Sequence, residues 1–246
     1  MKSAFITGAN KGIGLETARQ LLQKGFYVYI GSRNLENGKQ AVEKLASEGL
    51  VNAEAIQLDV TDDDSVRNAR IEIGKKTDVL DILINNAGIN ADGIAEDAKA
   101  ASIENFKKIY ETNVYGVVRV TTAFVDILKK SQEPRIVNVS SNMGSLALHS
   151  DPNSPNYGYK AFCAYSSSKS ALNMYTIHLA YELRDTPFKV NAICPGLTKT
   201  DHTKFFGGDV EIAGQRIVKY ALLDREGVTG KFISEELNPE TGEIPW

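Results

Sequence analysis

Short apolar runs alternate with segments of helical periodicity along all 246 residues. The segments between the runs repeat apolar residues at helical spacing, as in Ala18, Leu21 and Leu22. Strands that alternate with helices pair in parallel, because each helix carries the chain back along the sheet. We therefore expect an α/β fold, a doubly wound parallel sheet of seven strands in one domain over residues 1–246. The expected strands are Ala4–Thr7, Tyr27–Ile30, Ala53–Leu58, Ile82–Asn85, Ile136–Val139, Val190–Ile193 and Phe232–Ile233.

Composition excludes several classes of protein. With 42% hydrophobic residues, 24% charged residues and a net charge of −3, the chain indicates neither disorder nor a surface for a nucleic acid. No apolar run approaches the ~18 residues that a membrane span needs, and the first residues have no charged and apolar leader pattern. We expect no membrane partner and a cytoplasmic location.

Cysteine and histidine residues give no sign of a metal site. Cys163 and Cys194 lack zinc-like spacing and suit a reducing compartment, where both are expected to be small buried hydrophobes. A thiol near the active site is the alternative for Cys163. His149, His178 and His202 are far apart and form no ligand motif, so no metal is expected.

Two turn-rich segments interrupt the alternation, at about 142–164 and 198–214. The first contains Pro152 and Pro155, and the second pairs Phe205 and Phe206 with two glycines. Both follow sheet strands, and ligands of such folds bind at that edge. They are expected to be substrate loops, with ordinary surface loops as the alternative.

A glycine-rich turn follows the first strand. Gly8, Gly12 and Gly14 provide positions without a Cβ where the backbone can approach a pyrophosphate. The next helix begins there, and its first N–H groups favour an anion. The turn therefore predicts a Rossmann-type dinucleotide site that also includes Asn10, Lys11 and Ile13.

Tyr165 and Lys169 are four residues apart on an expected helix, so their side chains share one face. Reduction of a carbonyl needs a proton for the oxygen, and a phenol with a pKa of about 10 needs a neighbouring cation to favour its anion. We expect Lys169, together with a positively charged nicotinamide, to lower the pKa of Tyr165. The pair predicts hydride chemistry with Tyr165 as the proton donor.

The order of motifs resembles the short-chain dehydrogenase/reductase superfamily over essentially the whole chain. The turn reads GxxxGxG, and the matching segments are Leu58-Asp59-Val60, Asn85-Asn86-Ala87-Gly88, Asn113, Ile136 to Ser141, Tyr165 with Lys169, and Pro195-Gly196 with Thr200. Asn10-Lys11, the 24-residue interval from Ser141 to Tyr165 and the tail Glu243 to Trp246 resemble the carbonyl reductase-like branch.

The resemblance implies a role for each matched residue. Asn113, Ser141, Tyr165 and Lys169 would be catalytic. Ser141 would bind the carbonyl oxygen, with Ser140 as the alternative, and Asn113 would position a water behind the lysine. The implied cofactor contacts are Asp59 and Val60 at adenine, Asn86 along the cofactor, Tyr165 and Lys169, and Pro195, Thr198 and Thr200 on the nicotinamide side. Asn85 would only tie the sheet.

Charge at the end of the second strand predicts which nicotinamide cofactor binds. An NAD site places an acid there for the ribose hydroxyls, whereas a 2′-phosphate needs cations. Ser32 stands in the position of the acid, and Arg33 follows. Lys11 adds a second cation, so NADP(H) is expected.

The sequence therefore predicts an NADPH-dependent reductase of ketones, aldehydes or quinone-like carbonyls. The alternatives are a 3-oxoacyl-thioester reductase and a non-catalytic NADPH-binding sensor or scaffold. Pocket walls are expected from Ser141, Met143, Tyr157 and Phe205. The loop at 142–164 is expected to pack over the surface that relatives use to dimerise, which favours a monomer over a homodimer.

Overall fold

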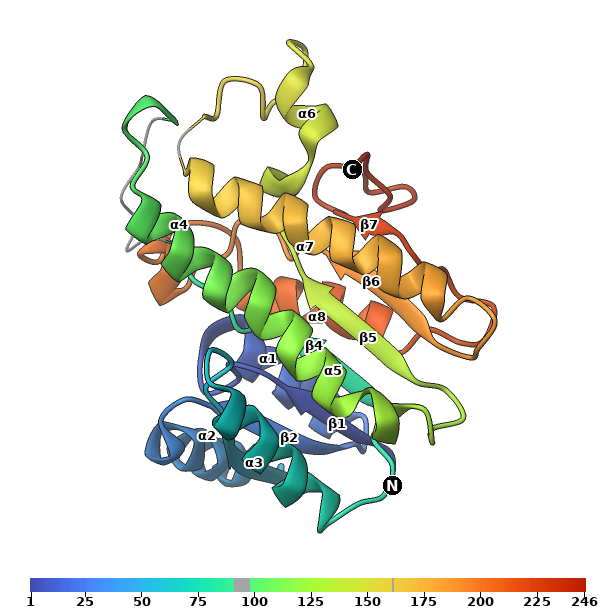
Figure 1. The fold of residues 1–246 in the computed structure, drawn as a ribbon. Coiled ribbons are helices and arrows are strands. Elements are labelled where there is room, and N and C mark those ends of the chain that lie inside the picture. Colours follow the sequence, from blue (N-terminus) through green and yellow to red (C-terminus); the bar gives the residue numbers. More distant parts are fainter. Residues whose placement is uncertain (91–97, 161) are drawn as a thin grey trace.

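The computed structural model describes residues 1–90, 98–160 and 162–246, apart from the side chain of His202. Seven parallel strands of this described chain form one sheet in the order β3-β2-β1-β4-β5-β6-β7 (Figure 1). The expected doubly wound α/β fold is confirmed. The strands are β1 Ser3–Ile6, β2 Tyr27–Ser32, β3 Ala53–Gln57, β4 Ile82–Asn85, β5 Arg135–Val139, β6 Lys189–Ile193 and β7 Phe232–Ile233.

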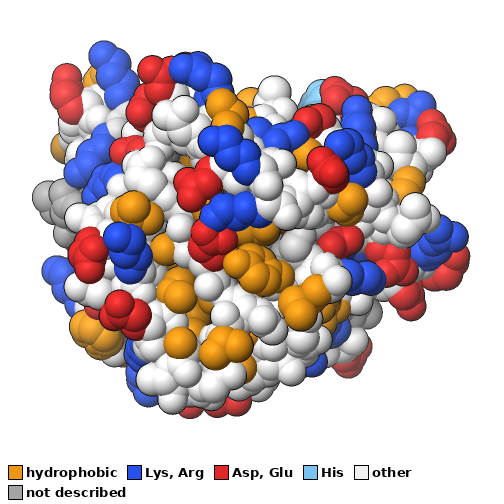
Figure 2. Space-filling model, turned by 90° about the horizontal axis from the view of Figure 1, so that it is seen from below, with side chains coloured by type: hydrophobic (Ala, Val, Ile, Leu, Met, Phe, Trp, Pro, Cys, Tyr) orange, Lys and Arg blue, Asp and Glu red, His pale blue; other side chains and the backbone are white. Residues whose placement is uncertain are grey.

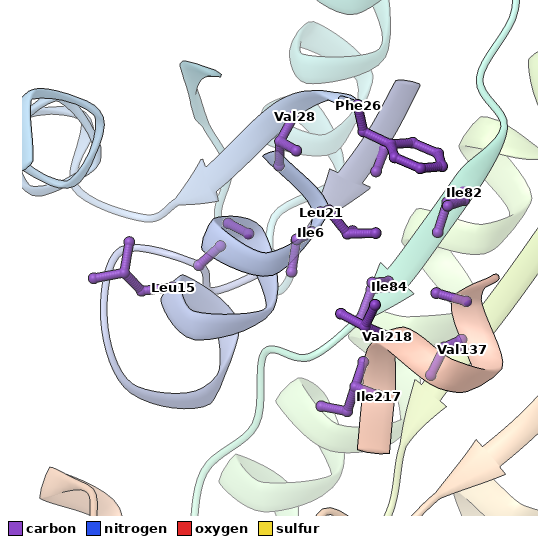
Figure 3. Packing of buried hydrophobic residues seen from close by; sticks show 14 of the residues in the cluster. Ile6, Leu15, Leu21, Phe26, Val28, Ile82, Ile84, Val137, Ile217 and Val218 are labelled. Carbon is purple, nitrogen blue, oxygen red and sulfur yellow. The ribbon is translucent and has the colours of Figure 1, made fainter. Parts of the chain in front are cut away.

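Helices cover both faces of the sheet (Figure 1). Neighbouring residues of a strand point to opposite faces, so Ala4 and Ile6 pack with α1, α2 and α8, whereas Phe5 packs with α3 and α5. Figure 3 shows the hydrophobic cluster on the face covered by α1, α2 and α8. In this cluster Leu21 of α1 and Ile217 of α8 lie against strand residues. The longer helices are α1 Gly12–Gln23, α2 Leu35–Ser47, α3 Asp63–Gly74, α4 Ile103–Tyr110, α5 Gly116–Leu128, α7 Cys163–Glu182 and α8 Val210–Ala221.

Short helical turns stand between the main elements. They are η1 Ala98–Ala100, η2 Glu111–Tyr115, η3 Asn142–Gly144, α6 Leu146–Ser150 and η4 Asp201–Thr203. The η2 turn is a π-helix that joins α4 to α5, and such turns occur often at functional sites. Three of the other turns, η3, α6 and η4, lie in the two segments that the sequence predicts to be substrate loops.

The surface carries charges of both signs. Figure 2 shows one face, on which Lys and Arg alternate with Asp and Glu around scattered hydrophobic side chains. On this face no continuous block of positive charge is visible. No helix among the described residues has the length and hydropathy needed to span a membrane.

Arg135, the first residue of β5, is only 2% exposed. Its guanidinium donates hydrogen bonds to four backbone carbonyls, those of Leu223, Asp224, Pro134 and Pro187. Two of these carbonyls, those of Leu223 and Asp224, belong to the turn that follows α8. Burial lowers the pKa of Arg135 below its usual value. This residue joins the start of β5 to the end of α8.

Replacing Arg135 by Met should destabilise the fold by about 3 kcal/mol, because the four carbonyls would lose their donor in a buried place. Urea unfolding measures the change. Arg67→Met is the matched control, since Arg67 forms only an exposed ion pair with Asp64 and should change stability by less than about 0.5 kcal/mol. Equal effects of the two substitutions would show that the buried contacts contribute nothing.

Candidate active site

The predicted site residues lie where four parallel strands end. The glycine-rich turn follows β1, Asn86 follows β4, Ser141 follows β5, and Pro195 follows β6. The chain order reverses between β1 and β4, so a crevice is expected outside the carboxyl ends of these two strands. Segments far apart in sequence therefore meet at one edge of the sheet.

The glycine-rich turn is shaped as a cradle. Gly8 and Gly12 have φ values of +64° and +56°, a region that residues with a side chain rarely adopt. A Cβ on Gly14 would lie 2.5 Å from the Asn86 amide nitrogen, so only glycine fits there. Lys11 is the N-cap of α1, and no side chain caps this helix end. The free N–H groups expected at that end suit a phosphate.

Asn86 holds the turn in place. Its amide Nδ2 donates to the carbonyls of Thr7 and Gly8 at 2.9 and 3.0 Å. The Thr7 hydroxyl in turn accepts from the N–H groups of Asn86 and Ala87. Asn86, predicted to contact a cofactor, therefore also has a structural role, because it fixes the backbone of the glycine-rich turn. Asn85 is buried and bonds to Thr121 and Asn138, which supports the expectation that it only ties the sheet.

Two of the predicted cofactor contacts pack on the core. Ile13, the second residue of α1, is partly buried and packs against the core on the α1 side. Val60 is buried in the core cluster on the α3 and α5 side, and its carbonyl accepts from Arg119. The helix packing takes up much of that side chain, and the contact of Val60 with adenine stays a prediction. Asp59 accepts from both the N–H and the hydroxyl of Thr61.

The two cations predicted for a phosphate differ in their surroundings. Arg33 is exposed, and no ion pair engages it among the described residues. Lys11 instead forms an ion pair with Asp201, with 2.5 Å between Nζ and Oδ2. The charge of Lys11 is therefore partly balanced by the segment that follows β6. Ser32 is buried, and its hydroxyl donates to the carbonyl of Asn34.

Ser141, Tyr165 and Lys169 come together after the end of β5 and in the first two turns of α7. The Ser141 hydroxyl lies close enough to the Tyr165 hydroxyl to lower the pKa of the phenol. Lys169 Nζ lies 5.6 Å from the centre of the Tyr165 ring and donates to the Val139 carbonyl at 2.8 Å. Ser140, the alternative to Ser141, is buried and donates to Asn173. Of the two serines, Ser141 is the one beside the phenol.

Asn113 lies in the π-turn η2 and is fully buried. Its Oδ1 accepts from the Ile89 N–H, and its Nδ2 donates to the Ile89 carbonyl and to Ser168 Oγ. A Cβ on Gly88 would lie 3.4 Å from Asn113 Oδ1 and 3.6 Å from Lys169 Nζ. Asn113 therefore lies next to the lysine, and its side chain fixes the segment that follows β4.

Burial is the largest influence on the pKa values of Tyr165 and Lys169. It raises the pKa of Tyr165 to about 12, and the hydrogen bond from Ser141 opposes this shift. Burial also lowers the pKa of Lys169 to about 8. Both shifts have burial as their largest cause, because each group is taken out of water. That Lys169 together with a positively charged nicotinamide lowers the pKa of the phenol stays a prediction.

The predicted substrate residues line an open edge. Tyr157, Tyr159 and Phe205 are 44%, 51% and 68% exposed, while Met143 is half-buried. Tyr159 packs on Phe162, with 6.1 Å between the ring centres. Tyr115 of η2 and Met174 of α7 also stay exposed, so the loop leaves this part of the predicted dimer surface uncovered. The monomer stays a prediction.

The segment after β6 closes on itself. Thr198 pairs with Gly208 in a β-bridge, and Thr203 Oγ1 donates to the Thr198 carbonyl. Lys204 and Phe205 have positive φ values at the tip of this loop. Thr200 Cγ2 lies 3.4 Å from a Cβ built on Gly12, so the loop touches the glycine-rich turn. Arg216 of α8 holds the Pro195 carbonyl at 2.7 Å.

Several supporting residues were missed at the sequence level. Asn138 bonds to Thr176, Asn173 to Ser140, and a Cβ on Gly144 would lie 2.8 Å from the Lys169 backbone. An asparagine within the apolar run Ile136–Val139 was the available signal, since a buried amide needs partners. A groove of about 640 Å³ between α3 and α5 contains none of the site residues.

Comparisons with known proteins agree with this geometry. The chain is 36% identical over 288 residues to a (+)-neomenthol dehydrogenase of Arabidopsis thaliana, covering 95% of this chain and 96% of that protein. It is 32% identical over 296 residues to a salutaridine reductase of Papaver somniferum, covering 94% and 93%. The structure of an NADPH-bound carbonyl reductase from chicken fatty liver aligns with a TM-score of 0.84 at 27% identity, covering 100% of this chain and 99% of that one. The model of the short chain dehydrogenase family matches residues 2–210, and the chain belongs to this family.

Proposed function

We propose that this protein uses NADPH to reduce a ketone, aldehyde or quinone-like carbonyl, with Tyr165 as the proton donor. The observation that carries the proposal is the placement of the Ser141 hydroxyl beside the Tyr165 phenol and the buried amine of Lys169, at the edge that also holds the glycine-rich turn. The relatives reported above are named as dehydrogenases and reductases, which supports this class of reaction.

NADPH suits the turn and its surroundings. Gly8, Gly12 and Gly14 leave room for the pyrophosphate, and the uncapped start of α1 offers N–H groups to it. In this proposal the exposed guanidinium of Arg33, the residue after β2, binds the 2′-phosphate. Bound NADPH supplies the hydride for the carbonyl carbon. The chain itself must orient the carbonyl and supply the proton.

Ser141 and Tyr165 share the carbonyl oxygen in this proposal. Ser141 Oγ accepts from the Met143 N–H, which directs the serine hydroxyl. The raised pKa keeps Tyr165 protonated at neutral pH, as a proton donor requires. Lys169, cationic below its pKa of about 8, is close enough to stabilise the phenolate that remains after the transfer.

In this proposal Asn113 is a positioning residue, which holds the segment after β4 next to Lys169. Both hydrogens of its amide are used by Ile89 and Ser168, and Oδ1 already accepts one N–H. These contacts hold the π-turn and the segment after β4 against α7, next to Lys169. A water behind the lysine, as the resemblance implies, would find at most one further acceptor position on this side chain.

Replacing Tyr165 by Phe should lower the rate of carbonyl reduction at least ~10²-fold, because only the proton donor is lost, while NADPH still binds. A panel of carbonyl compounds, with a 3-oxoacyl thioester among them, scored by NADPH consumption measures the effect. Tyr181→Phe is the matched control, because Tyr181 is exposed on the same helix. Retained turnover in the Tyr165 variant would refute the assignment, and NADPH binding without any turnover by the natural chain would favour a sensor.

Replacing Arg33 by Ala should weaken NADPH binding tenfold or more and leave NADH binding nearly unchanged. A charge-assisted hydrogen bond contributes about 1.5–3 kcal/mol, and only NADPH carries the 2′-phosphate. Fluorescence titration with both cofactors gives the two dissociation constants, with Arg67→Ala as the control for loss of a distant cation. An equal loss of affinity for both would mean that Arg33 stacks on adenine instead.

The value of kcat/KM for the carbonyl should fall as the pH rises through about 8. Lys169 has a lowered pKa, so it is charged below about 8 and neutral above it, whereas Tyr165 stays protonated throughout this range. A pH profile at saturating NADPH tests this. Lys169→Met should be slower and lack the decline, while an unchanged decline in that variant would assign the titration to another group.

A further inference from the structure

Residues 244–246 bind the segment that follows Ser141. Ile244 is joined to the sheet by a hydrogen bond from its N–H to the Phe232 carbonyl, and the Trp246 ring stacks on Phe232 with 5.3 Å between ring centres. The backbone oxygen of Trp246 then accepts from the Ala147 N–H at 3.0 Å. Figure 1 shows the last residues, in red, beside the strand β7.

Ser145 is the link between the two segments. It is fully buried, and its hydroxyl donates to the Pro245 carbonyl at 2.7 Å while it accepts from the Leu148 N–H at 3.1 Å. Leu148 packs on the same apolar cluster as Ile244 and Trp246. One hydroxyl therefore both caps α6 and ties it to residues 244–246.

The tied segment continues directly into the catalytic group. Gly144 packs against the Lys169 backbone with no room for a side chain, and its carbonyl accepts from Ser170 Oγ. Met143 donates its N–H to Ser141 Oγ. Residues 141–148 are thus held from one side by α7 and from the other by residues 244–246. A shift of α6 would therefore displace Met143 and Ser141.

We propose that residues 244–246 form a clamp, and that Trp246 and Ser145 are positioning residues that set the affinity for the carbonyl substrate. The proposal rests on carbonyl reduction as the function of this site. Neither residue lies in the turn after β1 that would hold the NADPH pyrophosphate, so we expect a smaller effect on NADPH binding than on carbonyl binding. Misplacement by about 1 Å in a supporting shell is enough to impair a site.

The test compares Trp246→Ala, Trp246→Phe, Ser145→Ala and the matched control Ser150→Ala, whose hydroxyl only bonds within exposed α6. Trp246→Ala and Ser145→Ala should raise KM for the carbonyl about tenfold with kcat and the NADPH dissociation constant changed less than about twofold. Trp246→Phe, which keeps a ring on Phe232, should restore most of the affinity. A loss of stability alone, with KM unchanged well below the unfolding temperature, would overturn the positioning role.

Hydrogen exchange tests the clamp without any turnover. In Trp246→Ala and Ser145→Ala, the amides of residues 146–150 should exchange faster than in the natural chain and in Ser150→Ala, whereas those of β1 and α1 should not. Unchanged exchange in residues 146–150 would overturn the clamp. If no carbonyl is reduced even by the natural chain, the proposed function fails, and the exchange rates still decide whether residues 244–246 hold α6.

Discussion

The contact between the turn after β1 and the segment after β4 determines where both halves of the site lie. Asn86 donates to Thr7 and Gly8, and Gly14 packs against the same amide with no space for a Cβ. Because β1 and β4 are neighbours at the reversal of strand order, this junction shapes the mouth of the crevice. The Gly88 backbone then leads directly to Asn113 and Lys169.

Burial of charge sets the chemistry of the site. Lys169 is buried and donates to the Val139 carbonyl, and its burial lowers its pKa to about 8. The same environment keeps Tyr165 protonated. Arg135, at the other end of β5, is also a buried cation. Its guanidinium donates to four backbone carbonyls instead of one. Both strand ends depend on backbone oxygens to accept from a buried cation.

Much of the fold and part of the site could be predicted from local pattern. Alternating apolar runs and helical periods predict all seven strands, because the periods of strands and helices differ. The glycines of the turn and the spacing of Tyr165 and Lys169 follow from local requirements of backbone approach and helix geometry. These features depend on residues close together in the chain, so no tertiary information is needed to recognise them.

Other properties depend on which distant segments meet. The Val60 side chain is buried in the core, Ile13 packs partly against it, and Lys11 pairs with Asp201, 190 positions away. The pKa values of Tyr165 and Lys169 depend on how completely other elements exclude water, which residue spacing does not encode. The contact of residues 244–246 with α6 likewise joins segments that are far apart in the sequence. Sequence alone determined the sheet, the glycine-rich turn and the identity of the candidate site residues. Tertiary packing decided their burial, their partners and the course of the loops at 142–164 and 198–214, because desolvation and contact are properties of the folded chain.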